Sequence, residues 1–343
     1  MPASPLRIGF AGCGRVTADL HLPALARIAG IEAVALADPD GARAREVAAR
    51  FGIAAVHADA AALVADPGVD LVAVCSPPRH HAEAALAALA AGRHVFVEKP
   101  LALDLDSAGA LAEAAAASGR VAAAGFNLRV HRQVVAARAA LTEGRLGRLR
   151  MVRTHWTAVA RPQGWRADPA AGGGALWELG IHHLDLWRFL SGLEPEAVHA
   201  AGDHDALALT ARLEDGTLLA TTLATGTSDA NLVELVGDRG RLLLDLFRGD
   251  GPAWAPLGRA AGGVGVRLRA AAASAASLPR QARAARAGGD YRLSYAAEWA
   301  AVLAAVRDGA PPPADLEDGR RAVALAVAAE RALRDGGTVG LVA

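Results

Sequence analysis

The sequence predicts an α/β protein: an N-terminal doubly wound parallel sheet, followed by an α+β domain with a largely antiparallel open sheet. Three observations predict this fold class. Up to Phe126, short apolar segments alternate with alanine-rich segments of helical length, which is typical of parallel sheets covered by helices. A glycine-rich turn joins the first apolar segment to the first helix. Beyond Phe126, polar and apolar residues alternate along consecutive segments, which indicates antiparallel strands. We expect one domain at residues 1–126 and a second at residues 127–343.

Length and composition exclude several classes of protein. A chain of 343 residues is long enough for about two domains. Its 36 basic and 36 acidic residues balance, so no net field attracts nucleic acid or an anionic membrane. Two cysteines, Cys13 and Cys75, are too few for a disulfide framework. The N-terminus lacks a signal-peptide pattern, and no apolar stretch is long enough to span a membrane. We expect a soluble cytoplasmic protein without nucleic-acid or membrane partners.

The first expected strand, residues 6–11, runs directly into a Gly-Cys-Gly turn, and a helix is expected over residues 15–28. In this context Gly12 permits the tight turn, and Gly14 lets the backbone approach a pyrophosphate. The free N–H groups at the start of the helix would hold that anion. Thr17 stands at the third glycine position and is small enough for close packing of helix and strand. The loop therefore predicts a dinucleotide site of the Rossmann type, with these candidate contacts: Gly12, Gly14, Arg15 and Val16.

The second expected strand, residues 31–37, ends at Asp38. A carboxylate at this position can hydrogen-bond both hydroxyls of an adenosine ribose and would repel a 2′-phosphate. This favours NAD as the cofactor, with NADP as the alternative. Asp38 could instead only open the turn at residues 38–41 and cap the next helix. The two roles are compatible.

The alternation of strands and helices continues to Phe126. Strands are expected at residues 54–56, 71–75, 95–97 and 121–126, and helices at 40–50, 59–64, 81–91 and 104–118. In a sheet of this kind a dinucleotide lies between the first and fourth strands. That arrangement brings Cys13 and Cys75 close together, and we interpret both as small packing residues, because neither has a neighbouring base that would lower its pKa.

The strand at residues 95–97 leads to Glu98 and Lys99, and Pro100 prevents the strand from continuing. Lys99 is the only lysine in the chain. A partly buried lysine can shift its pKa and exchange a proton, whereas arginine stays protonated. Ligands in open α/β sheets bind at the carboxyl ends of strands. Lys99 is therefore a candidate functional residue; the alternative is a lysine retained by chance at a strand end.

The second half of the chain has a different pattern. A helix is expected at residues 132–143. Strands are expected at 150–155, 206–213, 217–223, 232–236 and 241–245. Hairpin turns at Asp215–Gly216 and Asp238–Gly240 would join two pairs of these strands. The chain closes with helices at 295–307 and 316–334, separated by a triple-proline turn, and a final strand at 339–342.

One helix, expected at residues 175–190, interrupts these strands. Glu178, His182 and Asp185 are spaced i, i+4, i+7 and share one face of a regular helix. His183 lies on the apolar face and is interpreted as a packed core or interface histidine. Because acids flank His182, it could act as a general acid or base whose pKa they adjust. The alternative is an ordinary surface histidine that pairs with an acid four residues away. We expect no metal, because ligands on one helix turn rarely complete a site and no further His or Cys cluster is in register.

Residues 251–289 contain no acidic residue. One interpretation is that this stretch contacts an anion or a phosphate-bearing substrate. The preferred interpretation is a solvent-exposed segment or a contact between subunits. Its arginines are Arg259, Arg267, Arg269, Arg280, Arg283 and Arg286.

Taken together, these motifs resemble the glucose–fructose oxidoreductase/inositol dehydrogenase (Gfo/Idh/MocA) family. The resemblance covers the chain from Ile8 to Val342. It is carried by Gly12-x-Gly14, Ser76–Pro77–Pro78, His81–Ala82–Glu83, Glu98–Lys99–Pro100, Gly125–Phe126–Asn127, Gly173–Gly174–Ala175, Gly180–Ile181–His182, Asp185 and Asp318–Gly319.

The resemblance implies an NAD(P)-dependent oxidoreductase. The reaction would be reversible hydride transfer between nicotinamide and a secondary alcohol or ketone of a sugar, inositol or sugar derivative. It places Lys99 at the oxygen of the reacting carbon and His182 as the proton-transfer residue. Glu178 is the third candidate catalytic residue and, with Asp185, would orient His182 for proton transfer. It stands where many relatives have aspartate, which changes the acid/base geometry.

The resemblance also implies further contacts. A cis bond before Pro100 is expected, as is a homodimer or homotetramer formed through the open face of the second-domain sheet. Cofactor contacts would include Ser76, Pro77, His81, Glu98 and Lys99. Substrate contacts would include Asn127, Arg129, Trp165, Arg166 and Asp185.

Two other functions remain open from the sequence. A glycoside hydrolase of the same fold would keep NAD bound and recycle it through transient oxidation, releasing sugar without net NADH. A non-catalytic, nucleotide-sensing regulator would lack the catalytic set, and the retained Lys99 and His182 argue against it. The loops that determine the substrate cannot be placed from the sequence.

Overall fold

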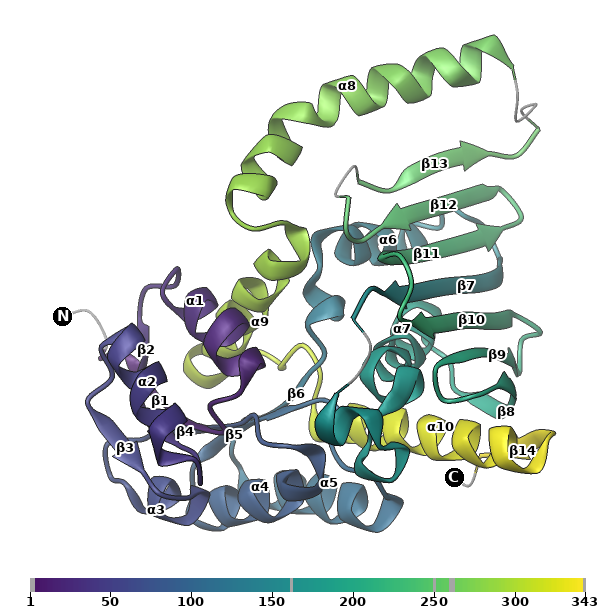
Figure 1. Ribbon diagram of the computed structural model, residues 1–343. Helices are drawn as coiled ribbons and strands as arrows, with labels where there is room; N and C mark the ends of the chain where they lie inside the picture. Colours follow the sequence, from purple (N-terminus) through teal and green to yellow (C-terminus); the bar gives the residue numbers. More distant parts are fainter. Residues whose placement is uncertain (1–3, 161–162, 249–250, 259–262, 342–343) are drawn as a thin grey trace. The chain divides into compact units, whose positions relative to one another are not determined.

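The computed structural model describes residues 4–160, 163–248, 251–258 and 263–341. The chain divides into two compact units, whose elements are labelled in Figure 1. The first unit takes the chain as far as Asn127, together with Ala170–Gly172 and Tyr295–Ala324. The second unit takes Leu128–Pro169, Gly173–Ser294 and the chain from Leu325 onward.

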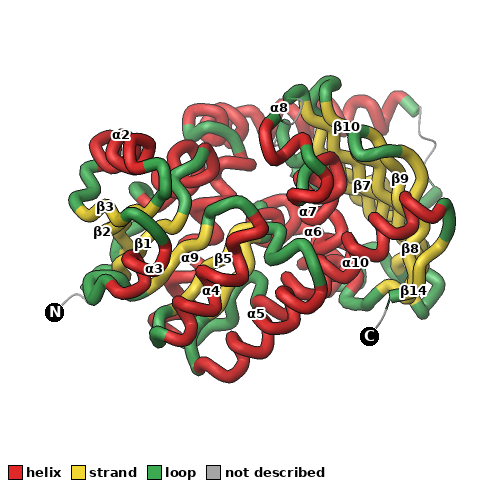
Figure 2. The backbone as a smooth tube through the Cα atoms, turned by 60° about the horizontal axis from the view of Figure 1, so that its bottom comes forward, coloured by secondary structure: helices red, strands yellow, loops and turns green. Residues whose placement is uncertain are grey.

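The first unit is built on a six-stranded sheet in the order β3-β2-β1-β4-β5-β6. Every neighbouring pair is parallel, so the predicted doubly wound sheet is confirmed, with its switch point between β1 and β4. Figure 2 shows red helices around the yellow strands of this sheet. The strands are β1 (Leu6–Ala11), β2 (Ile31–Ala37), β3 (Ala55–His57), β4 (Leu71–Val74), β5 (His94–Glu98) and β6 (Ala122–Gly125).

Aspartate N-caps mark where most helices of this unit begin. The side chains of Asp40, Asp59 and Asp104 each accept a hydrogen bond from the backbone N–H three residues later, which satisfies an otherwise unpaired donor of the first turn. This places the helix starts within a residue or so of the predicted positions. The helices are α1 (Leu22–Leu25), α2 (Gly41–Phe51), α3 (Ala60–Ala65), α4 (His81–Ala90) and α5 (Leu105–Ser118).

The helix after the glycine loop differs from the regular helix predicted over residues 15–28. It contains a π-turn, η1 (Thr17–His21), and α1 ends at Leu25. A π-turn is wider than an α-turn and changes the direction of the side chains that follow it. His21, the last residue of the π-turn, is fully buried.

The core of the first unit includes a segment from late in the chain. Trp299 belongs to α9 (Asp290–Asp308) and packs against Phe10 of β1 and Phe96 of β5, with ring centroids 5.9 and 4.6 Å apart. The predicted boundary assigned this segment to the second domain, whereas Tyr295–Ala324 lies in the first compact unit. Trp299 is fully buried, and its ring contacts with Phe10, Phe96 and His21 join this segment to the N-terminal unit.

The second unit is built on an eight-stranded sheet in the order β13-β12-β11-β7-β10-β9-β8-β14. All pairs are antiparallel except β7–β10, so the predicted, largely antiparallel sheet is confirmed. Two of its strands, β8 and β13, were not expected. The strands are β7 (Leu149–Ala158), β8 (Pro195–Gly202), β9 (Ala206–Leu213), β10 (Leu218–Thr225), β11 (Ala230–Gly237), β12 (Gly240–Asp245), β13 (Ala253–Pro256) and β14 (Thr338–Gly340).

The helices of this unit include α6 (Arg132–Thr142) and α7 (Ile181–Ser191), both of which contact the sheet. A π-turn, η6 (Leu176–Gly180), precedes α7 directly. The last helix is α10 (Leu316–Asp335). Val342, the last residue of the final predicted strand, lies outside the described residues.

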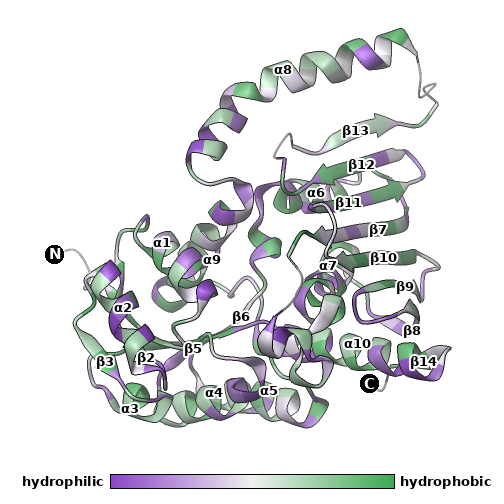
Figure 3. Ribbon diagram, viewed as in Figure 1, coloured by the Kyte–Doolittle hydropathy of each residue, from purple (hydrophilic) through white to green (hydrophobic). Residues whose placement is uncertain are grey.

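The basic stretch contains a 23-residue helix, α8 (Val264–Arg286), which the sequence pattern did not predict. Hydrophilic and hydrophobic residues are mixed along its length (Figure 3). Arg267, Arg280, Arg283 and Arg286 are exposed, in agreement with the preferred interpretation of a solvated segment. Arg259 and the side chain of Arg269 lie outside the described part of the chain. Within the described residues, no helix combines the length and apolarity needed to cross a membrane.

Candidate active site

The glycine loop is held tightly on one side and is open on the other. Gly12 has φ of +105°, and a Cβ there would lie 2.7 Å from the backbone of Cys75, so only glycine fits. A Cβ on Gly14 would meet nothing within 4 Å. The Thr17 hydroxyl donates a hydrogen bond of 2.7 Å to the Gly12 carbonyl. The loop thus has an open surface at Gly14 that a ligand can approach.

Asp38 links the end of β2 to this loop. Its side chain is 6% exposed, and it accepts hydrogen bonds from the backbone N–H groups of Cys13 (2.8 Å) and Asp40 (2.9 Å). Asp40 caps α2, so capping alone does not explain Asp38. The Arg43 guanidinium lies 3.7 Å from the Asp38 carboxylate. A fixed carboxylate at this position agrees with the predicted ribose contact, which stays a prediction.

Two loops meet at His81, the first residue of α4. One ring nitrogen lies 2.7 Å from the Ser76 carbonyl oxygen, after β4, and the other 2.8 Å from the Pro100 carbonyl oxygen, after β5. Burial lowers the pKa of His81 although both carbonyls favour its charged form, and a neutral ring donates to one of them at a time. The Ser76 hydroxyl is buried and has no hydrogen-bond partner among the described residues.

Glu98 and Lys99 lie at the carboxyl end of β5. Glu98 is 6% exposed and accepts hydrogen bonds from the Lys99 backbone N–H (3.0 Å) and from the His21 ring (2.9 Å). Burial alone would raise the pKa of Glu98, but the His21 hydrogen bond and the nearby positive charge of Lys99 outweigh burial and lower it. Lys99 is half-buried, and its bond to Pro100 is cis, as the resemblance implied.

Neither cysteine is activated. Both thiols are buried and free, and burial raises the pKa of Cys13 to about 12 and that of Cys75 well above its usual value. A neutral thiol is a poor nucleophile. The two cysteines are therefore packing residues, as predicted.

In the second unit, His182 is the second residue of α7, the helix that follows the π-turn η6. It is 2% exposed, and its ring lies 5.4 Å from the Trp156 ring with a 36° angle between the planes. The prediction of a regular helix through Glu178 is wrong, because that residue lies within the π-turn. A spacing of 3.6 residues per turn therefore does not place Glu178 relative to His182.

The two acids of the predicted face are paired with different arginines. Glu178 lies 3.2 Å from Arg166. Asp185 forms two hydrogen bonds with Arg129, of 2.6 and 2.8 Å, in a buried bidentate ion pair. The structure thus brings together four predicted site residues as two ion pairs.

The neighbouring histidine, His183, is a core residue, as predicted. It is fully buried, and its Nε2 donates a hydrogen bond of 3.1 Å to the Asn231 side-chain oxygen. Burial lowers the pKa of His183 to about 4, so the ring is neutral at pH 7.

The remaining substrate candidates have diverse surroundings. Asn127 is buried, and it is the last residue of the N-terminal segment that belongs to the first unit. Trp165 and Arg166 share a short 3₁₀ turn, η4 (Gly164–Ala167), where the guanidinium lies 5.2 Å from the indole centroid. Their contacts with a substrate stay predictions. No pattern in the sequence pointed to His21 and Trp299, which lie 278 positions apart and are joined by a hydrogen bond, although His21 also contacts Glu98.

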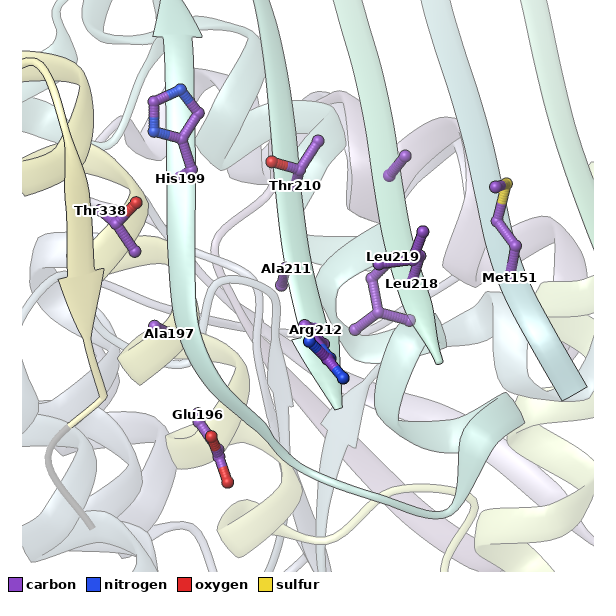
Figure 4. Close-up of a pocket in the computed structure, with 11 residues that line it drawn as sticks. Met151, Glu196, Ala197, His199, Thr210, Ala211, Arg212, Leu218, Leu219 and Thr338 are labelled. Carbon is purple, nitrogen blue, oxygen red and sulfur yellow. The ribbon is translucent and has the colours of Figure 1, made fainter. Parts of the chain in front are cut away.

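The eight-stranded sheet has a hollowed face with none of the predicted site residues. Figure 4 shows His199 and Thr210 on the neighbouring strands β8 and β9, and Met151 on β7; Leu218 of β10 is 48% exposed. Association of copies through this face stays a prediction. Among the described residues there is no group of three or more His, Cys, Asp or Glu side chains that could hold a metal ion.

Known proteins match both units. The family model described as an oxidoreductase family with an NAD-binding Rossmann fold (GFO_IDH_MocA) matches residues 6–126. The model of the GFO/IDH/MocA C-terminal domain matches residues 134–243.

Individual relatives agree with these matches. Myo-inositol 2-dehydrogenase of Thermotoga maritima is 28% identical over 98% of this chain and 98% of its own length. The 1,5-anhydro-D-fructose reductase of Ensifer adhaerens is 36% identical over 57% of this chain, and the match spans 61% of that protein, less than two thirds. The crystal structure of a probable dehydrogenase from Thermotoga maritima has a TM-score of 0.80 at 27% identity and covers 98% of both chains.

The fold, the glycine loop and the family models lead to one assignment. The parallel sheet carries a glycine loop after β1 and a buried acid after β2, and the second unit matches the C-terminal domain of the same family. The chain belongs to the Gfo/Idh/MocA family of oxidoreductases, and residues 6–126 form its NAD-binding Rossmann domain.

Proposed function

We propose that this chain is an NAD-dependent dehydrogenase that acts on a secondary alcohol or ketone of a sugar, inositol or sugar derivative. The observation that carries the proposal is the position of the only lysine, Lys99, at the carboxyl end of β5, where ligands bind in open α/β sheets. An inositol dehydrogenase and an anhydrofructose reductase among the relatives support a polyol or sugar as the substrate.

The residues of the first unit fit a dinucleotide. Gly14 leaves open space where a pyrophosphate would approach the backbone, and the helix start that follows offers free N–H groups. The buried Ser76 hydroxyl has no partner in the described part of the chain, and a bound ligand would give it one. When bound, the nicotinamide accepts a hydride from the substrate carbon or returns one to it.

Asp38 would bind the adenosine ribose, which gives a prediction about cofactor choice. We expect a clear preference for NAD over NADP, because a carboxylate repels a 2′-phosphate. In Asp38→Asn this negative charge is lost, while the positive charge of Arg43, 3.7 Å from the Asp38 carboxylate, remains. The loss of a charge-assisted hydrogen bond is worth about 1.5–3 kcal/mol, so the ratio of kcat/KM for NAD to that for NADP should fall roughly tenfold to a hundredfold. Steady-state kinetics with both cofactors measures this ratio.

Asp40→Asn is the matched control, because Asp40 is the neighbouring acid and serves as the N-cap of α2. Asparagine caps helices about as well as aspartate, so this variant should leave both the melting temperature and the cofactor ratio close to the wild-type values. A wild-type protein that prefers NADP would refute the role of Asp38.

In the proposed reaction, the side chains of Lys99 and His182 have separate tasks. Lys99 carries a compact positive charge that stabilises negative charge developing on the substrate oxygen. His182 takes the hydroxyl proton during oxidation and returns it during reduction. The contact with Trp156 restricts rotation of the His182 ring.

A substrate screen tests the proposed function. We expect sugars, inositols or nucleotide sugars to raise the melting temperature in the presence of NAD, and the stabilising compounds to yield NADH. Stabilisation by NAD alone, with no compound of these classes turned over, would contradict the proposed substrate class.

A further inference from the structure

A chain of hydrogen bonds inside the first unit ends at Lys99. His21 lies at the end of the π-turn η1 and is fully buried. Its Nδ1 lies 3.0 Å from the Trp299 indole nitrogen, and its Nε2 lies 2.9 Å from one oxygen of Glu98. The other oxygen of Glu98 accepts the Lys99 backbone N–H at 3.0 Å.

The direction of each hydrogen bond in this chain is fixed by chemistry. An indole N–H can only donate, so Nδ1 of His21 is the acceptor and carries no proton. The proton of the neutral ring is therefore on Nε2, which donates to Glu98. Both oxygens of the Glu98 carboxylate are thus engaged, one by His21 and one by the Lys99 amide. The carboxylate cannot turn without breaking one of these hydrogen bonds.

Aromatic rings enclose the chain of hydrogen bonds. The His21 ring packs edge-on against Phe96 and Tyr295, with centroids 5.4 and 5.2 Å apart. Trp299 lies against Phe96, two residues before Glu98. Surroundings with few polar groups strengthen the hydrogen bonds, and they also make an unpaired member costly.

The other titratable groups that face Glu98, apart from Lys99, favour their neutral forms, so that Glu98 is the ionised carboxyl group among them. Glu298 of α9 is 1% exposed, and neither of its oxygens has a hydrogen-bond partner within the described residues. Burial, and then the charge of Glu98, raise the pKa of Glu298 well above its usual value, which favours its neutral form. Cys75 is a neutral thiol and His81 has a lowered pKa because it is buried. Lys99 contributes a positive charge near Glu98 that favours the ionised carboxylate.

We propose that Trp299 and His21 are positioning residues: they fix the Glu98 carboxylate, which in turn holds the backbone from which Lys99 projects. This inference rests on the proposed role of Lys99 in the reaction. It gives a function to two buried residues that belong neither to the glycine loop nor to the strand ends.

The single lysine makes the inference testable without a substrate. Protein labelled with [¹⁵N]lysine gives one backbone amide resonance, that of Lys99, and an amide proton bonded to a carboxylate is deshielded. This resonance therefore reports the ionisation of Glu98 in a pH titration. In wild type the transition should lie below the usual range for a glutamate, because the His21 hydrogen bond and the Lys99 charge lower the pKa of Glu98.

Three variants, at two positions, test the inference, and each has a different expected titration. His21→Phe keeps a ring but loses the donor to Glu98, so only Lys99 still opposes the effect of burial, and the transition should move to higher pH by at least one unit. His21→Gln retains a donor and should restore part of the wild-type behaviour. Trp299→Phe loses only the donor to His21 and should cause a smaller shift in the same direction. With a substrate, both Phe variants should lower kcat about fivefold to tenfold, as expected for one hydrogen bond, with little change in NAD affinity.

Trp187→Phe is the matched control. Trp187 is also fully buried, but its indole nitrogen has no hydrogen-bond partner in the part of the chain that is described. This variant should keep the wild-type titration. Identical titrations in wild type, Trp299→Phe and His21→Phe would overturn the inference. If His21→Phe does not fold, Trp299→Phe and His21→Gln decide the question in the same way. Turnover retained in Lys99→Met would instead refute the proposed function, whatever the titrations show.

Discussion

Replacing Lys99 by methionine is expected to reduce kcat by roughly a hundredfold to a thousandfold, while NAD still binds. Methionine keeps an unbranched apolar side chain of similar length but has no charge to stabilise a developing alkoxide. Loss of one such stabilising group typically has an effect of about this size. Steady-state turnover and fluorescence titration with NADH measure the two quantities separately.

Lys99→Arg is the informative companion variant. Arginine retains the charge but spreads it over a planar, bulkier group, so an intermediate kcat is expected. Near-normal turnover in Lys99→Met would refute the assignment. A parallel loss of NAD affinity and kcat would show that Lys99 serves cofactor binding instead.

Replacing His182 by asparagine is expected to lower kcat by about a hundredfold to ten-thousandfold, the range associated with general acid–base catalysis. The side chain of asparagine forms hydrogen bonds but does not accept a proton near neutral pH. Because His182 takes up the proton released on oxidation, the rate of the variant should rise at high pH, where hydroxide and buffer bases replace it. Initial rates across pH, with melting temperatures, test this.

The neighbouring His183 provides the control. Its ring is buried and bonded to Asn231, so His183→Asn should lower the melting temperature, while kcat per folded molecule stays within a few-fold of wild type. If His183→Asn lowers kcat as much as His182→Asn does, the loss comes from disturbed packing of α7 and not from proton transfer.

Much of the first unit could be predicted from the sequence, because its signals are local. The strand at residues 71–75 is a continuous apolar run that ends at serine and two prolines, and it forms a buried parallel strand. Aspartates at positions 40, 59 and 104 marked helix starts. Gly12 and Asp38 were identifiable because a dinucleotide site imposes a fixed order of strand, turn and helix.

Other features could not be predicted, because no local pattern encodes them. The π-turns at Thr17–His21 and Leu176–Gly180 have the composition of ordinary helix, yet regular helical spacing does not apply to Glu178, which lies within the second. Strand β13, Ala253–Pro256, is short and lies among glycines and prolines. The contact between His21 and Trp299 joins positions 278 residues apart, and spacing carries no information over that distance.

The stoichiometry of the reaction tests the central claim most directly. Oxidation of a polyol or sugar should form one molecule of NADH for each molecule of substrate consumed, with a carbonyl at the carbon that loses the hydride. This ratio is measured by absorbance of NADH together with mass analysis of the product. Release of a free sugar from a glycoside with no accumulation of NADH would contradict the account and support the hydrolase alternative.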